Sequence, residues 1–197
     1  MSSDRLRPFF DLVTSRYLFV LVALTTLALT SGCASTTTVE RKPPSLLGDV
    51  VREQIEAAEP EWVSAQVESG AQAEPAAALA DVEPAEVTVY FGTWCGDSRR
   101  ELARFWKALD ETGGLVPFTV RYIAVDRYDE RPPELEDEVG LRWVPTFIVE
   151  RSGEELGRIV ESAPEGIEID MLALLTGDAS GTVSAREDMG GDGEIHP

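Results

Sequence analysis

The sequence is poor in histidine, cysteine and basic residues, and each scarcity excludes a class of function. Of its 197 residues, 17 are Lys or Arg and 36 are Asp or Glu, which gives a formal net charge of −19. A nucleic-acid-binding surface needs basic side chains to displace phosphate counterions. We therefore expect no nucleic-acid partner. We expect the excess acidic residues to form solvated surface rather than a docking patch.

Histidine is too scarce, and the carboxylates are too irregularly spaced, to indicate a metal site. His196 is the only histidine and lies in an acidic, glycine-rich C-terminal stretch, so we expect it to be neither a ligand nor a base. Asp126, Asp129 and Glu130 surround a loop without a regular ligand spacing, and we expect them to be solvated. The sequence predicts no metal and no cofactor.

The apolar run near the N-terminus is too short to be a stable membrane span. Residues 17–30 carry no charge, but as a helix they would rise only about 21 Å, less than the roughly 30 Å of a hydrocarbon core. Three arginines precede the run, and small residues followed by Cys33 come after it. This order is typical of a signal peptide. The small residues before Cys33 also resemble the lipobox of bacterial lipoproteins, although Thr30 stands where that motif prefers leucine.

The lipoprotein resemblance implies that residues 1–32 are removed and that Cys33 becomes a lipidated N-terminus. Two or more acyl chains anchor a protein stably. We therefore expect a membrane-anchored protein of the bacterial cell envelope, facing the periplasm or the exterior. Residues 33–45 are polar and contain prolines, as expected of a tether. An uncleaved signal anchor with a spare cysteine is the alternative, and it also places the rest of the chain outside the cytoplasm.

Hydrophobic periodicity divides the rest of the chain into three segments. Residues 46–81 are predicted to be an N-terminal extension with a helix over 46–58, a strand over 62–67 and a helix within 72–82. Residues 82–176 are predicted to contain strands at 86–91, 118–125, 145–150 and 156–160, and helices at 97–109, 132–139 and 167–175. This order predicts a mixed α/β sheet. Residues 177–197 are expected to form a disordered acidic tail.

Two short motifs coincide with this order of elements. Trp94-Cys95-Gly96-Asp97-Ser98 follows a predicted strand and opens a predicted helix, whereas Val144-Pro145-Thr146 begins the third strand. Together they resemble the thioredoxin family, in which Trp-Cys-Gly belongs to the active site and the proline of Val-Pro-Thr is cis and lies against the active-site sulfur. The resemblance covers residues 82–176. It implies a thioredoxin-like α/β fold with a mixed central sheet flanked by helices.

Cys95 is the residue with the clearest predicted chemistry. A helix N-terminus carries partial positive charge and free N–H groups, which stabilise a thiolate and lower the pKa of a thiol. Arg99 and Arg100 would add to this effect, while Asp97 would oppose it. Because the thiolate is the nucleophile of disulfide exchange, Cys95 is the predicted attacking sulfur. An inert cysteine in a fold reused for packing or binding is the alternative.

Two positions depart from the family pattern. Ser98 stands where a dithiol enzyme has its resolving cysteine, and Val89 stands where thioredoxin has a buried aspartate that assists proton transfer. The chain therefore lacks a self-contained dithiol cycle, and an external thiol would have to complete the reaction. The Cys-Gly-x-Ser spacing is also similar to that of monothiol glutaredoxins. Trp94 and the Val-Pro-Thr loop favour thioredoxin instead, so we expect no iron–sulfur cluster.

These motifs define the predicted site. Ser98 is expected to hydrogen-bond the sulfur of Cys95, and Pro145 is expected to shape a docking groove. The residues expected to contact a substrate are Trp94, Gly96, Trp143, Val144 and Thr146. Monothiol exchange with protein or small-molecule thiols and disulfides is the leading hypothesis. A non-enzymatic binding lipoprotein that docks an envelope partner through its tryptophans is the main alternative, and a sensor in which Cys95 becomes a sulfenic acid is another. The sequence alone leaves open whether the protein is an enzyme.

Overall fold

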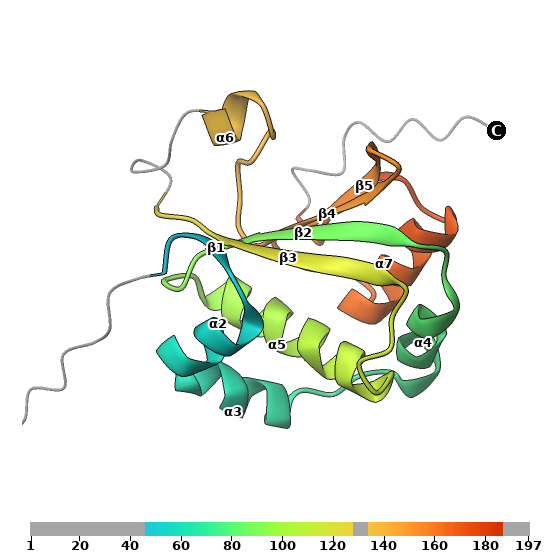
Figure 1. The fold of residues 1–197 in the computed structure, drawn as a ribbon, viewed down its shortest axis with the longest axis horizontal. Coiled ribbons are helices and arrows are strands. Elements are labelled where there is room, and N and C mark those ends of the chain that lie inside the picture. The colour runs from blue at the N-terminus through green and yellow to red at the C-terminus, as the bar shows by residue number, and fades with distance from the viewer. Residues whose placement is uncertain (1–45, 128–133, 187–197) are drawn as a thin grey trace, which may run out of the picture. The chain divides into compact units, whose positions relative to one another are not determined.

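A six-stranded mixed sheet forms the centre of the computed structural model, which describes residues 46–127 and 134–186. The strand order is β1-β3-β2-β4-β5-β6, and only the β2–β3 and β5–β6 pairs are parallel (Figure 1). The strands are β1 (Gly48–Val50), β2 (Ala85–Phe91), β3 (Phe118–Ala124), β4 (Thr146–Arg151), β5 (Glu154–Val160) and β6 (Gly181–Val183). The predicted signal peptide, Cys33 and the tether lie outside the described residues.

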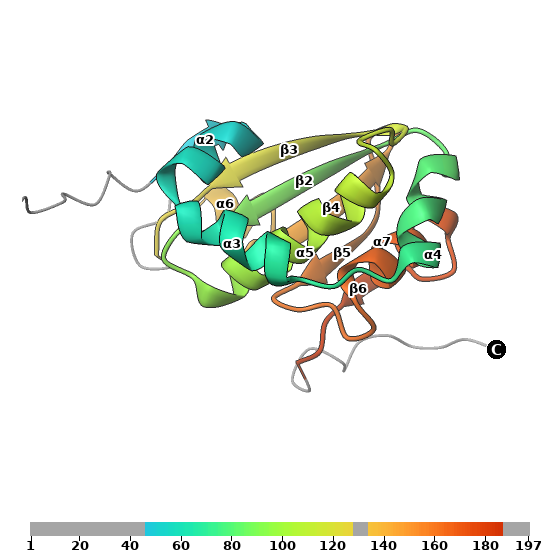
Figure 2. The same cartoon turned by 90° about the horizontal axis from the view of Figure 1, so that it is seen from below.

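The helices cover the two faces of the sheet unequally. Figures 1 and 2 show every helix except α6 on the same face. The helices are α2 (Arg52–Ala58), α3 (Pro60–Glu68), α4 (Ala73–Ala78) with the 3₁₀ turn η2 (Leu79–Asp81), α5 (Gly96–Glu111), α6 (Glu134–Asp137) and α7 (Ile167–Thr176). None of the helices in the described residues is long and apolar enough to span a bilayer. The predicted α/β class, a mixed sheet flanked by helices, is confirmed.

Two central elements carry most of the core. Val87, Val89 and Phe91 of β2 are almost completely buried against the helices, as expected for a central strand. Helix α5 has apolar residues at helical spacing and buries Phe105 and Trp106 on that face. The strands and helices predicted between residues 86 and 175 all form, with ends that differ by a few residues.

The prediction of a helix throughout residues 46–58 is wrong in its first half. Residues 48–50 form β1, which pairs antiparallel with β3 at the edge of the sheet, and α2 begins only at Arg52. Asp49 contributes to this pairing because its carboxylate accepts hydrogen bonds of 2.6 and 2.7 Å from Arg121 of β3. A partner 72 residues away therefore overrides the local helical pattern.

The strand predicted over residues 62–67 is also wrong, because this segment forms α3. Pro60 is the first residue of α3, where its missing N–H costs nothing. Trp62 and Gln66 lie one helical turn apart and are both buried. The indole of Trp62 packs against Trp106, with ring centroids 6.2 Å apart, so the extension belongs to the main core.

Part of the predicted disordered tail is ordered. Residues 181–183 form β6, which pairs parallel with β5, while residues 187–197, including His196, lie outside the described residues. Gly157 makes this pairing possible. A Cβ at that position would lie 2.6 Å from the carbonyl oxygen of Gly181 and 2.6 Å from a methyl carbon of Leu174.

Acidic side chains gather where α7 packs against α5. Glu168 and Asp170 are buried, and Glu101 of α5 is completely buried. Burial raises the pKa of Asp170, and the negative charges of Glu165, Glu168 and Glu101 raise it further, against a lowering by a hydrogen bond from the Glu165 N–H. One oxygen of Glu101 accepts hydrogen bonds from Arg100 and Arg104, whereas Oε2 has no hydrogen-bond partner. Ionisation of Asp170 therefore opposes folding.

We expect Gly157→Ala to lower the free energy of unfolding by about 1–3 kcal/mol, because the new methyl group would overlap β6 and α7. Gly70→Ala is the matched control, since a Cβ there meets nothing within 4 Å, and it should change stability by no more than about 0.5 kcal/mol. Urea unfolding of both variants measures the difference. Equal stability of the two variants would contradict the described packing of β6.

Asp170 predicts a pH dependence of stability. Its pKa is higher in the folded protein than the ordinary value of 3.8, so its contribution favours folding below that value and is lost as the pH rises through the folded pKa. The difference in the free energy of unfolding, Asp170→Asn minus the parent protein, should therefore be more positive at pH 7 than at pH 4. Urea unfolding at both pH values checks this, with the exposed Glu154→Gln as a control for the loss of one negative charge. A difference that is smaller at pH 7 than at pH 4 would contradict the prediction.

Candidate functional site

Cys95 lies between β2 and α5, as the sequence predicts. It is the N-cap residue of α5, with φ −98° and ψ 121°, and its thiol is free and half-buried. The sulfur accepts a hydrogen bond from the backbone N–H of Ser98 at 3.4 Å and donates one to the carbonyl oxygen of Val144 at 3.3 Å. The helix N-terminus thus directs an N–H donor at the sulfur.

The Val-Pro-Thr loop is held in place beside this sulfur. The Val144–Pro145 peptide bond is cis, as the family resemblance implies. The hydroxyl of Thr146 donates to the carbonyl oxygen of Trp143 at 2.8 Å, and the carbonyl oxygen of Pro145 accepts from the N–H of Glu161 at 2.7 Å. The structure therefore brings together two motifs that are about 50 residues apart in the sequence.

The two tryptophans expected at the site have different environments. Trp94 donates from Nε1 to the carbonyl oxygen of Val125 at 3.2 Å, and the guanidinium of Arg127 lies 4.9 Å from the centre of its ring. Its ring also covers Gly92, where a Cβ would be only 2.6 Å from the indole. Trp143 is 39% exposed. The sequence interpretation missed Gly92, although a glycine directly after a buried strand is a signal of close approach.

Ser98 hydrogen-bonds the Cys95 sulfur through its backbone N–H rather than through its hydroxyl. Its side chain is completely buried, and its hydroxyl oxygen accepts a hydrogen bond from the N–H of Gly92 at 3.2 Å. The hydrogen bond to the sulfur comes from the Ser98 backbone instead, so the hydroxyl fixes the turn before the helix. Val89 is completely buried among apolar side chains, so this position provides no proton acceptor.

The charged residues of the first turn of α5 have separate roles. Arg100 forms ion pairs with Asp97 at 2.5 Å and with Glu101 at 2.9 Å. These pairs occupy its guanidinium, and they also balance the charge of Asp97, which we expected to oppose a thiolate. Arg99, by contrast, lines a small pocket together with Cys95.

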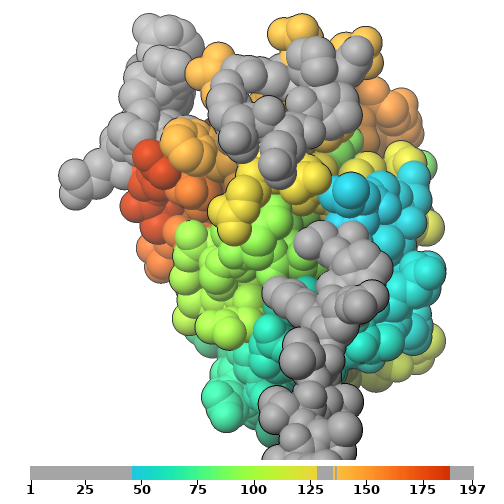
Figure 3. All heavy atoms as spheres, turned by 90° about the vertical axis from the view of Figure 1, so that its left-hand side faces the viewer, coloured from blue at the N-terminus to red at the C-terminus, as the bar shows by residue number. Residues whose placement is uncertain are grey.

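That pocket has a volume of about 140 Å³ and opens beside the sulfur. Its lining combines the predicted motif with α3 of the N-terminal extension: Glu61, Trp62, Thr93, Trp94, Cys95, Gly96 and Arg99. Figure 3 faces this end of the sheet and shows the light-green start of α5 beside yellow residues from the end of β3, with orange and red segments next to them. Sequence analysis did not identify Glu61, because it predicted a strand from residue 62 onward where the structure has α3.

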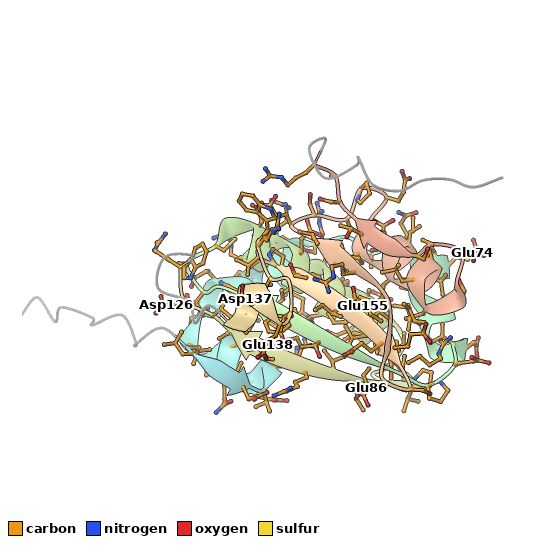
Figure 4. The ribbon with its side chains drawn as sticks, turned by 90° about the horizontal axis from the view of Figure 1, so that it is seen from above. Glu74, Glu86, Asp126, Asp137, Glu138 and Glu155 are labelled. Atoms are coloured by element: carbon orange, nitrogen blue, oxygen red, sulfur yellow. The ribbon has the colours of Figure 1, made fainter. Side chains whose placement is uncertain are left out.

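Carboxylates do not converge on a point near the sulfur. Within residues 46–127 and 134–186, no three His, Cys, Asp or Glu side chains form a group that could hold a metal ion. Figure 4 shows Asp126 and Glu155 well apart, with the other labelled carboxylates spread over the surface. Asp129 and Glu130 lie outside the described residues. The chemistry that the described site offers is that of a single thiol.

Comparisons with known proteins find likeness in structure only. No family model and no curated protein matches the chain. A Pseudomonas aeruginosa protein of unknown function is 17% identical, covers 64% of this chain and 86% of its own, and has a TM-score of 0.47. A thioredoxin from Malassezia sympodialis is 25% identical over 48% of this chain and 76% of its own, with a TM-score of 0.32. A chain from a structure described as showing the thiol resolving mechanism in yeast mitochondrial 1-Cys peroxiredoxin is 23% identical. The match covers 43% of this chain and 73% of that chain, with a TM-score of 0.27. By its own strand order and cis-proline loop, the described part of the chain has a thioredoxin-like fold.

Proposed function

We propose that the chain is a membrane-anchored, thioredoxin-like protein of the bacterial envelope that performs monothiol thiol–disulfide exchange through Cys95. The observation that carries the proposal is the position of the Cys95 sulfur, half-buried at the N-terminus of α5 and in contact with the loop before β4. A helix N-terminus and a directed N–H group both stabilise the thiolate that this chemistry needs.

The proposed reaction begins when the thiol of Cys95 loses its proton to solvent. The thiolate attacks one sulfur of a disulfide, the new bond joins Cys95 to that sulfur, and the other sulfur leaves as a thiolate. The Ser98 N–H still donates to the Cys95 sulfur at this stage, whereas the carbonyl oxygen of Val144 has lost its donor. This carbonyl and the exposed ring of Trp143 then face the substrate.

The second half of the reaction needs another molecule. Ser98 has a hydroxyl where a resolving thiol would be needed, and Cys95 is the only cysteine among the described residues. The mixed disulfide therefore persists until an external thiol attacks it, releases Cys95 as a thiolate and forms a new disulfide with the captured group. The protein therefore carries one captured thiol group as a mixed disulfide, whereas a dithiol enzyme would resolve that disulfide with its own second cysteine.

The anchoring part of the proposal rests on the N-terminal sequence. A charged segment, an uncharged run of limited length and small residues before Cys33 follow one another in the order of a lipoprotein signal. The anchor would leave the site outside the cytoplasm, where disulfides form and persist.

The exchange reaction predicts a stable adduct at Cys95. In the full chain carrying Cys33→Ser, so that Cys95 is the only cysteine, bis(2-hydroxyethyl) disulfide should add one mercaptoethanol group. Intact-mass spectrometry should show that the adduct lasts until a free thiol is added, and Cys95→Ser should show none. Reaction no faster than that of an ordinary free cysteine would contradict the proposal.

Ser98→Cys should change the outcome of the same experiment. The new thiol would stand one turn along α5, within reach of the captured sulfur, so the adduct should give way to an internal disulfide with release of mercaptoethanol. Mass spectrometry should show that the adduct mass disappears. A thiol-alkylating reagent should then label neither of the two cysteines, because both are in the disulfide. An adduct that persists in this variant as in its parent would show that the missing second cysteine does not explain the monothiol behaviour.

Lipidation predicts that the chain takes up a fatty acid at Cys33. Expressed in a bacterium fed with labelled palmitate, the parent chain and Cys95→Ser should both carry the label, whereas Cys33→Ala should carry none and should leave the membrane fraction. Gel fluorography and fractionation measure both effects. Label that is retained in Cys33→Ala would rule out a lipobox at this position.

A further inference from the structure

A second pocket is lined in part by Trp143, the residue before Val144, whose carbonyl oxygen contacts the sulfur. It has a volume of about 210 Å³ and is lined by Gly140, Arg142, Trp143, Arg158, Val160 and Thr182. Two of these residues are arginines, although the chain as a whole has a net charge of −19. A third arginine, Arg186, places its guanidinium 4.2 Å from the centre of the Trp143 ring. We call this feature the Trp143 pocket.

Hydrogen bonds fix the wall of the Trp143 pocket. Arg158 donates from Nη1 to the carbonyl oxygen of Val139 at 2.9 Å and from Nε and Nη2 to Glu155 at 2.6 and 2.5 Å. Gly140 turns the chain beside it with φ +68°, a left-handed conformation that favours glycine. Strand β6 supplies Thr182. The cavity is therefore built by parts of the chain that are held rigidly, rather than by loose surface side chains.

The charge balance of the Trp143 pocket is positive. Glu155 pairs with Arg158, and Glu161 pairs with Arg186 at 2.8 Å. No ion pair within the described residues engages the exposed guanidinium of Arg142. Among the described residues, one positive charge in the lining thus has no carboxylate partner. An exposed aromatic ring next to it adds a surface on which a planar anionic group can lie.

Two further arginines lie close to Cys95 and to Trp94. Arg99 lines the smaller pocket with Cys95, and Arg127 lies over the ring of Trp94. Glu61 also lines the smaller pocket, so the charge there is mixed. Of the two pockets, only the Trp143 pocket has arginines in its lining without a carboxylate among the lining residues. Its lining is therefore the better suited of the two to an anionic group.

We propose that the Trp143 pocket is a subsite for a carboxylate of the molecule that exchanges with Cys95, and that this molecule is a small anionic thiol or disulfide. The inference rests on the exchange function proposed above. Trp143 and Val144 are consecutive residues, and the carbonyl oxygen of Val144 contacts the sulfur. The pocket and the sulfur are thus connected through two consecutive residues of one loop.

The overall charge favours a small molecule over an acidic protein partner. Charges separated by more than about 8–10 Å are largely screened at physiological ionic strength, so a small anion interacts mainly with the nearby arginines. An acidic protein would be repelled by the negative charge of this chain, net −19, over a much larger contact area. The proposed reaction is the exchange already described, with one S–S bond broken, one formed and one thiolate released.

The test compares disulfides of similar length and different charge. The full chain carrying Cys33→Ser is treated with 3,3′-dithiodipropionate, a dianion, and with neutral bis(2-hydroxyethyl) disulfide, and adduct formation is timed by quenching and mass spectrometry. Each rate constant is divided by that of free mercaptoethanol with the same disulfide, which removes differences in intrinsic reactivity. The normalised rate for the dianion should exceed that for the neutral disulfide.

Variants locate the source of this preference. Arg142→Gln should lower the ratio of the two normalised rates by about twofold to fivefold, as expected for the loss of one exposed ion pair, and Arg142→Glu should lower it further. Lys107→Gln is the matched control. It removes one positive charge from the same chain at a point about 18 Å along α5 from Cys95, and it should leave the ratio unchanged.

The outcomes separate the two proposals. Fast reaction with both disulfides and a ratio that Arg142→Gln does not change would overturn the subsite and leave the exchange function standing. If neither disulfide reacts faster with the protein than with a free thiol, the exchange function is overturned. Titration of the tryptophan fluorescence with 3,3′-dithiodipropionate then tests whether an anion binds in the Trp143 pocket. Quenching that Arg142→Gln weakens and Lys107→Gln does not would support an anion site, and no quenching would overturn it.

Discussion

The contact between the Cys95 sulfur and the carbonyl oxygen of Val144 depends on the pairing of two central strands. Strands β2 and β4 run antiparallel, with Tyr90 opposite Thr146. This register sets the end of β2 beside the start of β4, so that the residues after β2 meet the residues before β4. A shift by one residue would move every side chain of the strand to the other face and would bury the wrong set. The buried Val89 thus fixes the site indirectly, through the register that its packing requires.

Segments outside residues 82–176 contribute to both pockets near this contact. Helix α3 inserts Trp62 into the core and so carries Glu61 to the pocket at the sulfur. Strand β6 adds Thr182 to the Trp143 pocket, and the residues after it bring Arg186 onto the ring of Trp143. The strand order and the loop before β4 provide the reactive position. The added segments determine what surrounds it, which is where selectivity for a substrate can arise.

The sequence predicts the part of this arrangement that local patterns encode. Strands β2 and β3 are short apolar runs, α5 has helical periodicity, and both motifs are contiguous, so their positions could be predicted. The errors occur where a distant partner decides the outcome. Residues 48–50 become a strand because β3 offers an edge, and residues 181–183 become one because Gly157, more than 20 residues earlier, has no side chain. The hydroxyl of Ser98 is a local exception: it accepts a hydrogen bond from the N–H of Gly92, a contact that no spacing rule reveals.

Charge links the single thiol to its surroundings. A monothiol mechanism needs two encounters with small thiols or disulfides, one to form the adduct and one to resolve it. A chain of net charge −19 disfavours anionic reactants at long range, and the arginines near Cys95 act only at short range. On the proposed mechanism, a captured group that places its carboxylate beside Arg142 neutralises the charge that attracted it. The resolving thiol then meets a less positive surface, so an anionic thiol should gain less from this pocket in the second step than in the first.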